Sequence, residues 1–213
     1  ISQNPKLLAT PQSEIFTSLN NWRGFQFGEK DTIELLERYP ELIHLPITKD
    51  LTIKLGIIKE YIGGGSNMIK LLMNSPQVLT QQNQAIKEKI NYLEKVMKIE
   101  TSEVYKSDVF SCDIMTIKTR HIFLKRLGLF VAKKIKDENE ISNNPKLYQI
   151  TDTSDKKFAT KVCHVTLEEF ETFEELYKRE LDGRSENDED EVDEQEDYDD
   201  EEQVSTYKKR SKR

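Results

Sequence analysis

Apolar and polar residues follow each other along this chain with the period of an α-helix, and the pattern recurs about every 35 residues. Residues 74–98 show it best, because a turn opened by Pro76 is followed by apolar positions three or four apart from Ile86 to Met97. This spacing places the apolar side chains on one face of a helix. A single unit cannot bury that face alone, so the pattern predicts similar units on either side.

Other segments share the start of this unit. The pattern is x-Pro-x-[Leu/Val]-[Leu/Ile], found in Asn4-Pro5-Lys6-Leu7-Leu8, Tyr39-Pro40-Glu41-Leu42-Ile43, Ser75-Pro76-Gln77-Val78-Leu79 and, more weakly, Lys106-Ser107-Asp108-Val109-Phe110. The three prolines are 35 and 36 residues apart. Ile86 and Leu93 lie as far from Pro76 as Ile117 and Leu124 lie from Ser107. Four such units predict an all-α fold, an α-helical solenoid.

Capping residues predict where several helices begin and end. Thr10-Pro11 and Thr48 are expected to start helices, because threonine caps free amides and proline at the first helical position loses no hydrogen bond. Gly63-Gly64-Gly65-Ser66 is interpreted as a helix stop, a turn and a new cap at Ser66, since a phosphate-binding loop needs a preceding strand and a following lysine. Gly128 is expected to end the long helix of the fourth unit.

The C-terminal part contains one strong helix signal. Thr166 and Glu169 form a capping box, in which each side chain satisfies a free amide of the other residue. We expect the helix to end at Asp182-Gly183 and to carry one apolar stripe, made of Leu167, Phe170, Phe173, Tyr177 and Leu181. Ser154 is expected to cap a short helix through Phe158, and residues 131–153 are expected to form an irregular loop.

Charge is divided unevenly along the chain. The whole chain carries −7, but residues 182–202 contain 14 acidic residues and one basic residue. That stretch therefore carries −13, while five basic residues follow it and residues 1–181 carry +1. Because a segment so charged and so poor in apolar side chains cannot bury a core, residues 182–213 are predicted to be disordered.

These patterns predict four parts. Residues 1–130 would form the repeats, and the incomplete first unit suggests an N-terminally cut fragment. Residues 131–153 would form the loop, and residues 154–181 would form helices that cap the solenoid and dock a partner. Residues 182–213 would form a disordered tail, acidic and then basic.

One stretch of the body is strongly basic. Residues 114–136 contain seven basic residues and no acidic one: Lys118, Arg120, Lys125, Arg126, Lys133, Lys134 and Lys136. Such a surface attracts nucleic-acid phosphates, and counterion release makes the binding tighter at low salt. A solvated helix with long basic side chains would have the same composition, so this stretch alone leaves both interpretations open.

The ending of the fourth unit carries a family resemblance. It has the pattern Lys-x-Arg-x-x-Phe-Leu-x-x-Leu-Gly, formed by Lys118, Arg120, Phe123, Leu124, Leu127 and Gly128. With the Pro-x-Leu-Leu units, it resembles the mitochondrial transcription termination factor (mTERF) family over roughly residues 1–180. The acidic tail narrows the resemblance to the fourth vertebrate branch of that family. The implied fold is a solenoid of helix triplets with a positive concave face.

The resemblance also implies a function. A protein of that branch binds mitochondrial ribosomal RNA and forms a heterodimer with an rRNA cytosine-5 methyltransferase, which it brings to the large ribosomal subunit. It acts in the mitochondrial matrix, in ribosome biogenesis and translation, and a transit peptide would be absent from this fragment. The expected RNA contacts are Lys118, Arg120, Lys125, Arg126, Lys133 and Lys134. The expected partner contacts are Phe158, Phe170, Phe173 and Tyr177, although the aromatic stripe could instead pack on the last repeat.

Catalysis, metals, cofactors and membranes have no support in the sequence. His44, His121 and His164 are scattered, and adjacent Cys163 and His164 are poorly placed to share a metal. The two cysteines form no Cys-x-x-Cys motif, so no disulfide scaffold is implied. No apolar run approaches the length of a membrane span. We therefore expect no enzyme activity, no cofactor, no small-molecule substrate and no membrane association.

Two other functions stay open. One is duplex DNA binding that ends or modulates organellar transcription, which would need arginines facing a groove. The body has five arginines: Arg23, Arg38, Arg120, Arg126 and Arg179. The other is a protein-interaction solenoid in which the basic stretch is incidental. The tail is either a solubilising spacer or a mimic of nucleic acid that competes for the basic surface.

Overall fold

The structure is a computed structural model that describes residues 6–132 and 143–190, and every regular element in those ranges is helical. The α-helices are α1 (Lys6–Ala9), α2 (Gln12–Arg23), α3 (Glu29–Arg38), α4 (Lys49–Ile62), α5 (Ser66–Asn74), α6 (Asn83–Asn91), α7 (Thr101–Val104), α8 (Ile114–Arg126), α9 (Leu147–Thr151), α10 (Asp155–Lys157) and α11 (Leu167–Asp190). Two 3-10 helices, η1 (Pro40–His44) and η2 (Pro76–Leu79), and two π-helical segments, η3 (Tyr92–Met97) and η4 (Phe158–Cys163), lie between them. The all-α prediction is confirmed.

The chain divides into two units, residues 1–174 and residues 175–213. The first unit contains the repeats and the start of α11. The described part of the second unit is the rest of that helix, and there Arg179 and Glu175 form an ion pair of 3.8 Å one turn apart.

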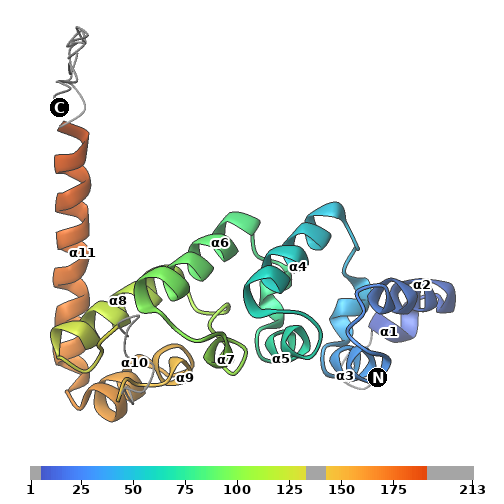
Figure 1. Ribbon diagram of the computed structural model, residues 1–213, viewed down its shortest axis with the longest axis horizontal. Coiled ribbons are helices and arrows are strands. Elements are labelled where there is room, and N and C mark those ends of the chain that lie inside the picture. Colours follow the sequence, from blue (N-terminus) through green and yellow to red (C-terminus); the bar gives the residue numbers. More distant parts are fainter. Residues whose placement is uncertain (1–5, 133–142, 191–213) are drawn as a thin grey trace, which may run out of the picture. The chain divides into compact units, whose positions relative to one another are not determined.

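Three successive repeats of the first unit each have a lead helix, a short motif turn and a long helix. These parts are α3, η1 and α4, then α5, η2 and α6, then α7, the turn at residues 107–112 and α8. Figure 1 shows α3, α5 and α7 in one row and α4, α6 and α8 in a second row. Because α3 contacts α5, α4 contacts α6 and α6 contacts α8, the units stack in chain order, as in a solenoid.

The core follows the predicted period. Ile86 and Leu93 in the third repeat and Ile117 and Leu124 in the fourth are completely buried. Each such aliphatic side chain stabilises the fold by about 2 kcal/mol. Trp22, in α2, is also completely buried. In the first copy of the motif, by contrast, α1 contains no buried residue.

Caps explain several helix boundaries. Thr48 accepts a hydrogen bond from the amide of Leu51 (3.2 Å) at the start of α4. The capping box is also confirmed, because Thr166 and Glu169 accept hydrogen bonds from each other's amides at 3.2 and 2.7 Å. Gly128 follows α8 with a φ of +71°, a conformation that favours glycine, so the predicted end there is confirmed as well.

Two predicted caps are wrong. The hydroxyl of Thr10 donates to the carbonyl of Lys6 (2.8 Å), because α1 precedes it by one turn and offers that acceptor. Ser66 is the first residue of α5 rather than its cap. The residue that caps α5 is Gly65, whose φ of +61° favours glycine, so Ser66 lies inside the helix.

The predicted loop at residues 131–153 contains a helix that hydrophobic periodicity does not reveal. Helix α9 spans Leu147–Thr151, and its Leu147 and Ile150 are completely buried. Five residues are too few to show a helical period, which is why the prediction failed here. A different signal was present, because Asn144-Pro145-Lys146-Leu147 repeats the four residues that begin the first motif.

The last helix also runs further than predicted. Helix α11 continues past Asp182 and Gly183 to Asp190. A glycine inside a helix costs only about 1 kcal/mol relative to alanine, so it does not by itself end one. The predicted disorder of the tail from residue 191 onward lies outside the described residues, as does the part of the predicted loop at residues 133–142.

Candidate nucleic-acid interface

Helix α8 carries four of the six cations predicted to contact RNA. The carboxylate of Asp113 caps it and accepts hydrogen bonds from the amides of Met115 (2.8 Å) and Thr116 (3.4 Å). The 13 residues of the helix include no acidic side chain. Positions 118, 120, 125 and 126 do not all lie on one face of a helix, so the environments of the four cations differ.

Lys118 is engaged with the preceding repeat. Its ammonium lies 2.7 Å from the carboxylate of Glu88 on α6 and 5.8 Å from the ring centre of Tyr92. Its side chain is only 30% exposed. Lys118 therefore has to share its charge between this carboxylate and any phosphate that approaches.

Arg120 is buried, so the prediction that it contacts RNA is wrong. Its side chain is 4% exposed and lies 4.8 Å from the ring centre of Phe158. Its guanidinium donates to the carbonyls of Ile150 and Thr153 and to the carboxylate of Asp155. The helical phase explains this, because position 120 lies three residues after the buried Ile117 and faces the following elements rather than solvent.

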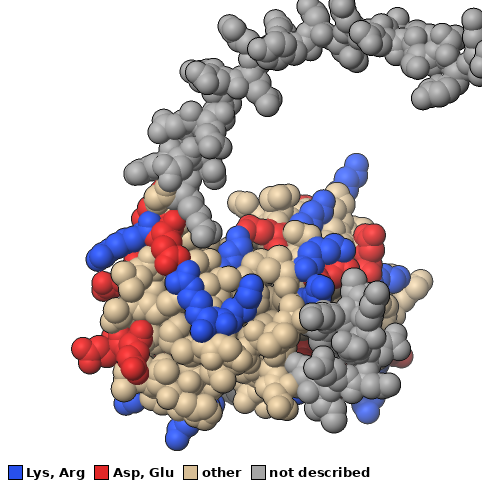
Figure 2. Space-filling model, turned by 60° about the vertical axis from the view of Figure 1, so that its left-hand side comes forward, with Lys and Arg blue, Asp and Glu red and all other residues tan. Residues whose placement is uncertain are grey.

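Lys125 and Arg126 are exposed at the last turn of α8. Cations suit this position, because they offset the partial negative charge of the helix C-terminus. Arg126 lies 5.3 Å from the ring centre of Phe173, and Lys125 forms no ion pair with any residue that the structure describes. Figure 2 shows lysine and arginine side chains gathered near the middle of one face, between groups of acidic side chains.

The two remaining predicted contacts, Lys133 and Lys134, lie outside the described residues. The ends of the segment that contains them are nevertheless placed. The side-chain amide of Asn144 accepts from the backbone of Val131 (2.9 Å) and donates to it (2.8 Å). These two bonds bring residues 131 and 144 together, a few residues after Lys125 and Arg126.

His121 belongs to the core. It is 1% exposed, its Nδ1 lies 2.8 Å from the hydroxyl of Tyr92, and its Nε2 is buried without a partner. Burial, with a smaller contribution from the charge of Lys125, lowers the pKa of His121 to about 4. The imidazole is therefore neutral at physiological pH and adds no charge to the basic surface.

The four residues predicted to contact a partner divide into two buried and two half-buried side chains. Phe158 and Phe170 are completely buried and lie 5.2 Å apart between ring centres, so the prediction that they dock a partner is wrong. The sequence shows no neighbour for an aromatic stripe on the last helix, whereas Phe170 lies 5.1 Å between ring centres from Phe123 of α8. Phe173 is half-buried against Phe123, and Tyr177 is half-buried in the second unit. The alternative, packing of the stripe on the last repeat, is confirmed for Phe170.

The two cysteines are free thiols. Burial raises the pKa of Cys163 to about 12 and also raises that of Cys112, so neither is a reactive thiolate at neutral pH. The described part of the chain contains no group of three His, Cys, Asp or Glu side chains placed to share a metal ion. Nor does any helix within residues 6–132 and 143–190 have the length and apolar character needed to cross a bilayer.

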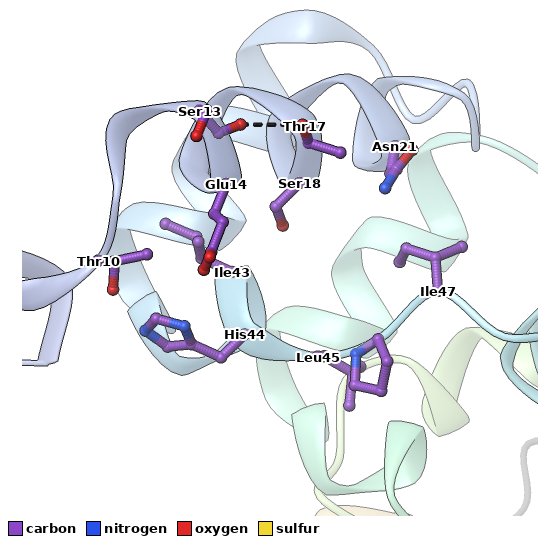
Figure 3. Close-up of a pocket in the computed structure, with 11 residues that line it drawn as sticks. Thr10, Ser13, Glu14, Thr17, Ser18, Asn21, Ile43, His44, Leu45 and Ile47 are labelled. Carbon is purple, nitrogen blue, oxygen red and sulfur yellow. Dashed lines mark hydrogen bonds between the residues drawn. The ribbon is translucent and has the colours of Figure 1, made fainter.

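A hollow of about 350 Å³ lies between α2 and the segment that follows η1. Its lining includes Ser13, Glu14, Thr17, Ser18 and His44 (Figure 3), and the hydroxyl of Thr17 donates to the carbonyl of Ser13 (2.8 Å). A carboxylate without a lysine or arginine repels phosphate. The hollow is therefore not part of a phosphate-binding surface.

The comparison with known families decides what kind of chain this is. The mTERF family model matches residues 1–159, about three quarters of the length. The chain belongs to the mTERF family. The prediction made from the repeat and from the ending of the fourth unit is thus confirmed.

A relative of this mTERF chain is known in mouse. "Transcription termination factor 4, mitochondrial" of Mus musculus is 24% identical over 181 residues, which are 84% of this chain and 52% of that protein. The chain thus spans about half the length of the curated relative that it matches. The number in the relative's name agrees with the resemblance to the fourth vertebrate branch.

Proposed function

We propose that this mTERF chain is a non-catalytic nucleic-acid-binding regulator of mitochondria, and that its ligand is ribosomal RNA. The observation that carries the proposal is the exposed pair Lys125 and Arg126 at the end of α8, within a basic stretch that contains no acidic residue. Family membership and the name of the mouse relative support the mitochondrial and nucleic-acid parts of this proposal.

The arginines of the body favour RNA over base-specific reading of duplex DNA. Reading base edges in the major groove relies on arginines that can form paired hydrogen bonds with guanine. Arg120 is buried, Arg23 is paired with Glu29 at 2.7 Å, and the guanidinium of the exposed Arg126 lies 5.3 Å from the ring centre of Phe173. Structured RNA is instead recognised through its shape, phosphates and 2′-hydroxyls, for which exposed lysines suffice.

The mechanism would be positioning. The solenoid would hold structured RNA by charge, and the C-terminal helix would hold an rRNA cytosine-5 methyltransferase as a heterodimer. Since Phe158 and Phe170 are buried, the apolar side chains of α11 proposed to meet the partner are Leu176, which is 50% exposed, and the half-buried Phe173 and Tyr177. Tyr177→Ala with Leu176→Ala should release the methyltransferase in a pull-down, while Lys178→Ala, next to them on α11, should retain it.

The RNA proposal is tested by the salt dependence of binding. Lys125→Gln with Arg126→Gln removes two phosphate contacts, so the slope of log K against log salt should fall in magnitude by about 1.4 to 1.8. Lys156→Gln with Lys157→Gln, two exposed lysines on α10, is the matched control and should leave the slope within about 0.5 of the native value. Competition between a ribosomal RNA fragment and duplex DNA of equal length distinguishes the transcription alternative.

Two results would overturn the proposal. If the variant with Lys125→Gln and Arg126→Gln has the same slope of log K against log salt as the native chain, these residues do not contact phosphates. No retention of RNA or DNA by the native chain at 50–100 mM salt, roughly where nonspecific binding is expected, would favour a protein-interaction solenoid.

A further inference from the structure

Three buried cations occupy the same position in successive repeats. Each lies three residues after the first buried aliphatic side chain of its long helix: Lys54 after Leu51, Lys89 after Ile86 and Arg120 after Ile117. Lys54 is 4% exposed, Lys89 6% and Arg120 4%. Lysine and arginine are almost never buried to this extent without a specific partner.

Each cation reaches the next repeat along the chain. The ammonium of Lys54 donates to the carbonyl of Leu79 at the end of η2 (2.8 Å). The ammonium of Lys89 donates to the carbonyl of Phe110 in the fourth motif turn (2.7 Å). The guanidinium of Arg120 donates to the carbonyl of Ile150 in α9, the helix that begins at Leu147, directly after Asn144-Pro145-Lys146.

These acceptors explain why a cation is needed. The last carbonyls of a short helical turn have no partner within that turn and need an outside donor. A charged donor forms a stronger hydrogen bond than a neutral one, and a buried ammonium without an acceptor is costly. Burial lowers the pKa of Lys89, and its ammonium also donates to the side-chain oxygen of Gln81 (3.2 Å).

We propose that Lys54, Lys89 and Arg120 form an inter-repeat ladder that sets the register of the solenoid. Aliphatic contacts alone tolerate sliding, because one apolar face fits another in several ways. A cation that meets its carbonyl in only one arrangement penalises every other arrangement, as buried polar groups do in coiled coils. Each rung would therefore fix the repeat that follows it.

The two ends of the ladder fit this arrangement. Ahead of Lys54, the ring nitrogen of the completely buried Trp22 donates to the carbonyl of Leu42 in η1 (3.1 Å), so a neutral donor links α2 to η1. Arg120 also reaches the carbonyl of Thr153 (2.9 Å) and the carboxylate of Asp155 (2.7 Å). The planar guanidinium serves several acceptors at once, which suits the junction between α8 and the elements after it.

The ladder is tested by hydrogen exchange of the full chain, measured peptide by peptide with mass spectrometry. Lys89→Met keeps the length of the side chain and removes the donor. The matched control is Lys87→Met, an exposed lysine on the same helix. Lys89→Arg restores a donor. Lys54→Met removes the donor at the preceding interface, between α4 and η2.

The expected result depends on position. In Lys89→Met, exchange at residues 107–112 should accelerate about tenfold or more relative to Lys87→Met, the factor expected for one lost hydrogen bond to a charged group. In Lys54→Met the acceleration should appear at residues 76–80 instead. Lys89→Arg should return residues 107–112 to within about threefold of native exchange.

Other outcomes would overturn the ladder. Equal exchange in Lys89→Met and Lys87→Met, or the same acceleration in every peptide, would show that the ammonium does not hold the following repeat. If Lys89→Met does not fold, Lys89→Gln replaces it, and unchanged exchange at residues 107–112 in that variant counts against the proposal. The experiment contains no RNA, so its outcome is independent of the proposed function.

Discussion

The middle and the end of α8 differ although they belong to one basic stretch. In the middle, Arg120 is buried among backbone carbonyls and Lys118 is paired with Glu88. At the end, Lys125 and Arg126 are exposed to solvent. The difference follows from helical phase. Arg120 lies on the same side of the helix as the buried Ile117 and Leu124, whereas Lys125 and Arg126 lie on other sides of the helix. A run of cations in a sequence therefore defines a binding surface only after its phase relative to the buried face is known.

The largest expected effect is on stability and concerns the buried cation, Arg120. Arg120→Met should lower the free energy of unfolding by about 3 to 4 kcal/mol, because it leaves the carbonyls of Ile150 and Thr153 without their donor. Lys125→Met should change the same quantity by less than about 0.5 kcal/mol. Urea denaturation of both variants checks this, and equal effects would show that the two cations do not have different roles.

The second effect concerns pH. The pKa of His121 is about 4 in the folded chain, below its ordinary value of 6.5. Between these values the unfolded chain binds a proton that the folded chain does not, so the free energy of unfolding falls as pH falls. The loss is at most about 1.4 kcal/mol per pH unit from this residue. His121→Leu should remove that part of the slope in denaturation curves measured between pH 7 and 4, and a slope equal to that of the native chain would contradict it.

The third effect tests whether the exposed cations compete with the acidic tail. Removal of residues 182–213 should raise the affinity for arbitrary RNA several-fold at low salt, because that segment carries a net charge of −8. The increase should disappear at high salt. Filter binding at two salt concentrations measures this, and unchanged affinity at low salt would assign the tail to a spacer role.

The smallest effect sharpens the position of Lys118. Glu88→Gln removes the carboxylate 2.7 Å from its ammonium and should raise RNA affinity about twofold. Glu94→Gln, an exposed change on the same repeat whose partner is the adjacent Lys95, is the control. A decrease in affinity would show that the pair orients Lys118 rather than occupying it.

Sequence reasoning succeeded where a pattern spans many residues. The equal spacing of Ile86, Leu93, Ile117 and Leu124 predicted the repeat and the core, since burial of an apolar face follows directly from helical period. The glycine after α8 and the Thr166–Glu169 box were local signals with one structural meaning.

It failed where the environment of a residue depends on a distant segment. The acceptors of Arg120 lie 30 or more residues further along the chain, so its burial was invisible in the sequence around it. The same holds for Phe158 and Phe170. The five residues of helix α9 are too few to show a period. The sequence Asn-Pro-Lys-Leu that leads into it at residues 144–147 nevertheless repeats residues 4–7 of the first motif.

The most direct test of the contrast between buried and exposed cations is lysine footprinting of the native chain, with and without a ribosomal RNA fragment. An amine-reactive reagent modifies exposed ammonium groups, and mass spectrometry measures the rate at each lysine. We predict that Lys54 and Lys89 react at least about tenfold more slowly than Lys125, both with and without RNA, because breaking a hydrogen bond of a charged group slows the reaction by about that factor. We also predict that RNA protects Lys125. Equal rates at all three lysines, or a Lys125 that saturating RNA leaves unprotected, would contradict the account.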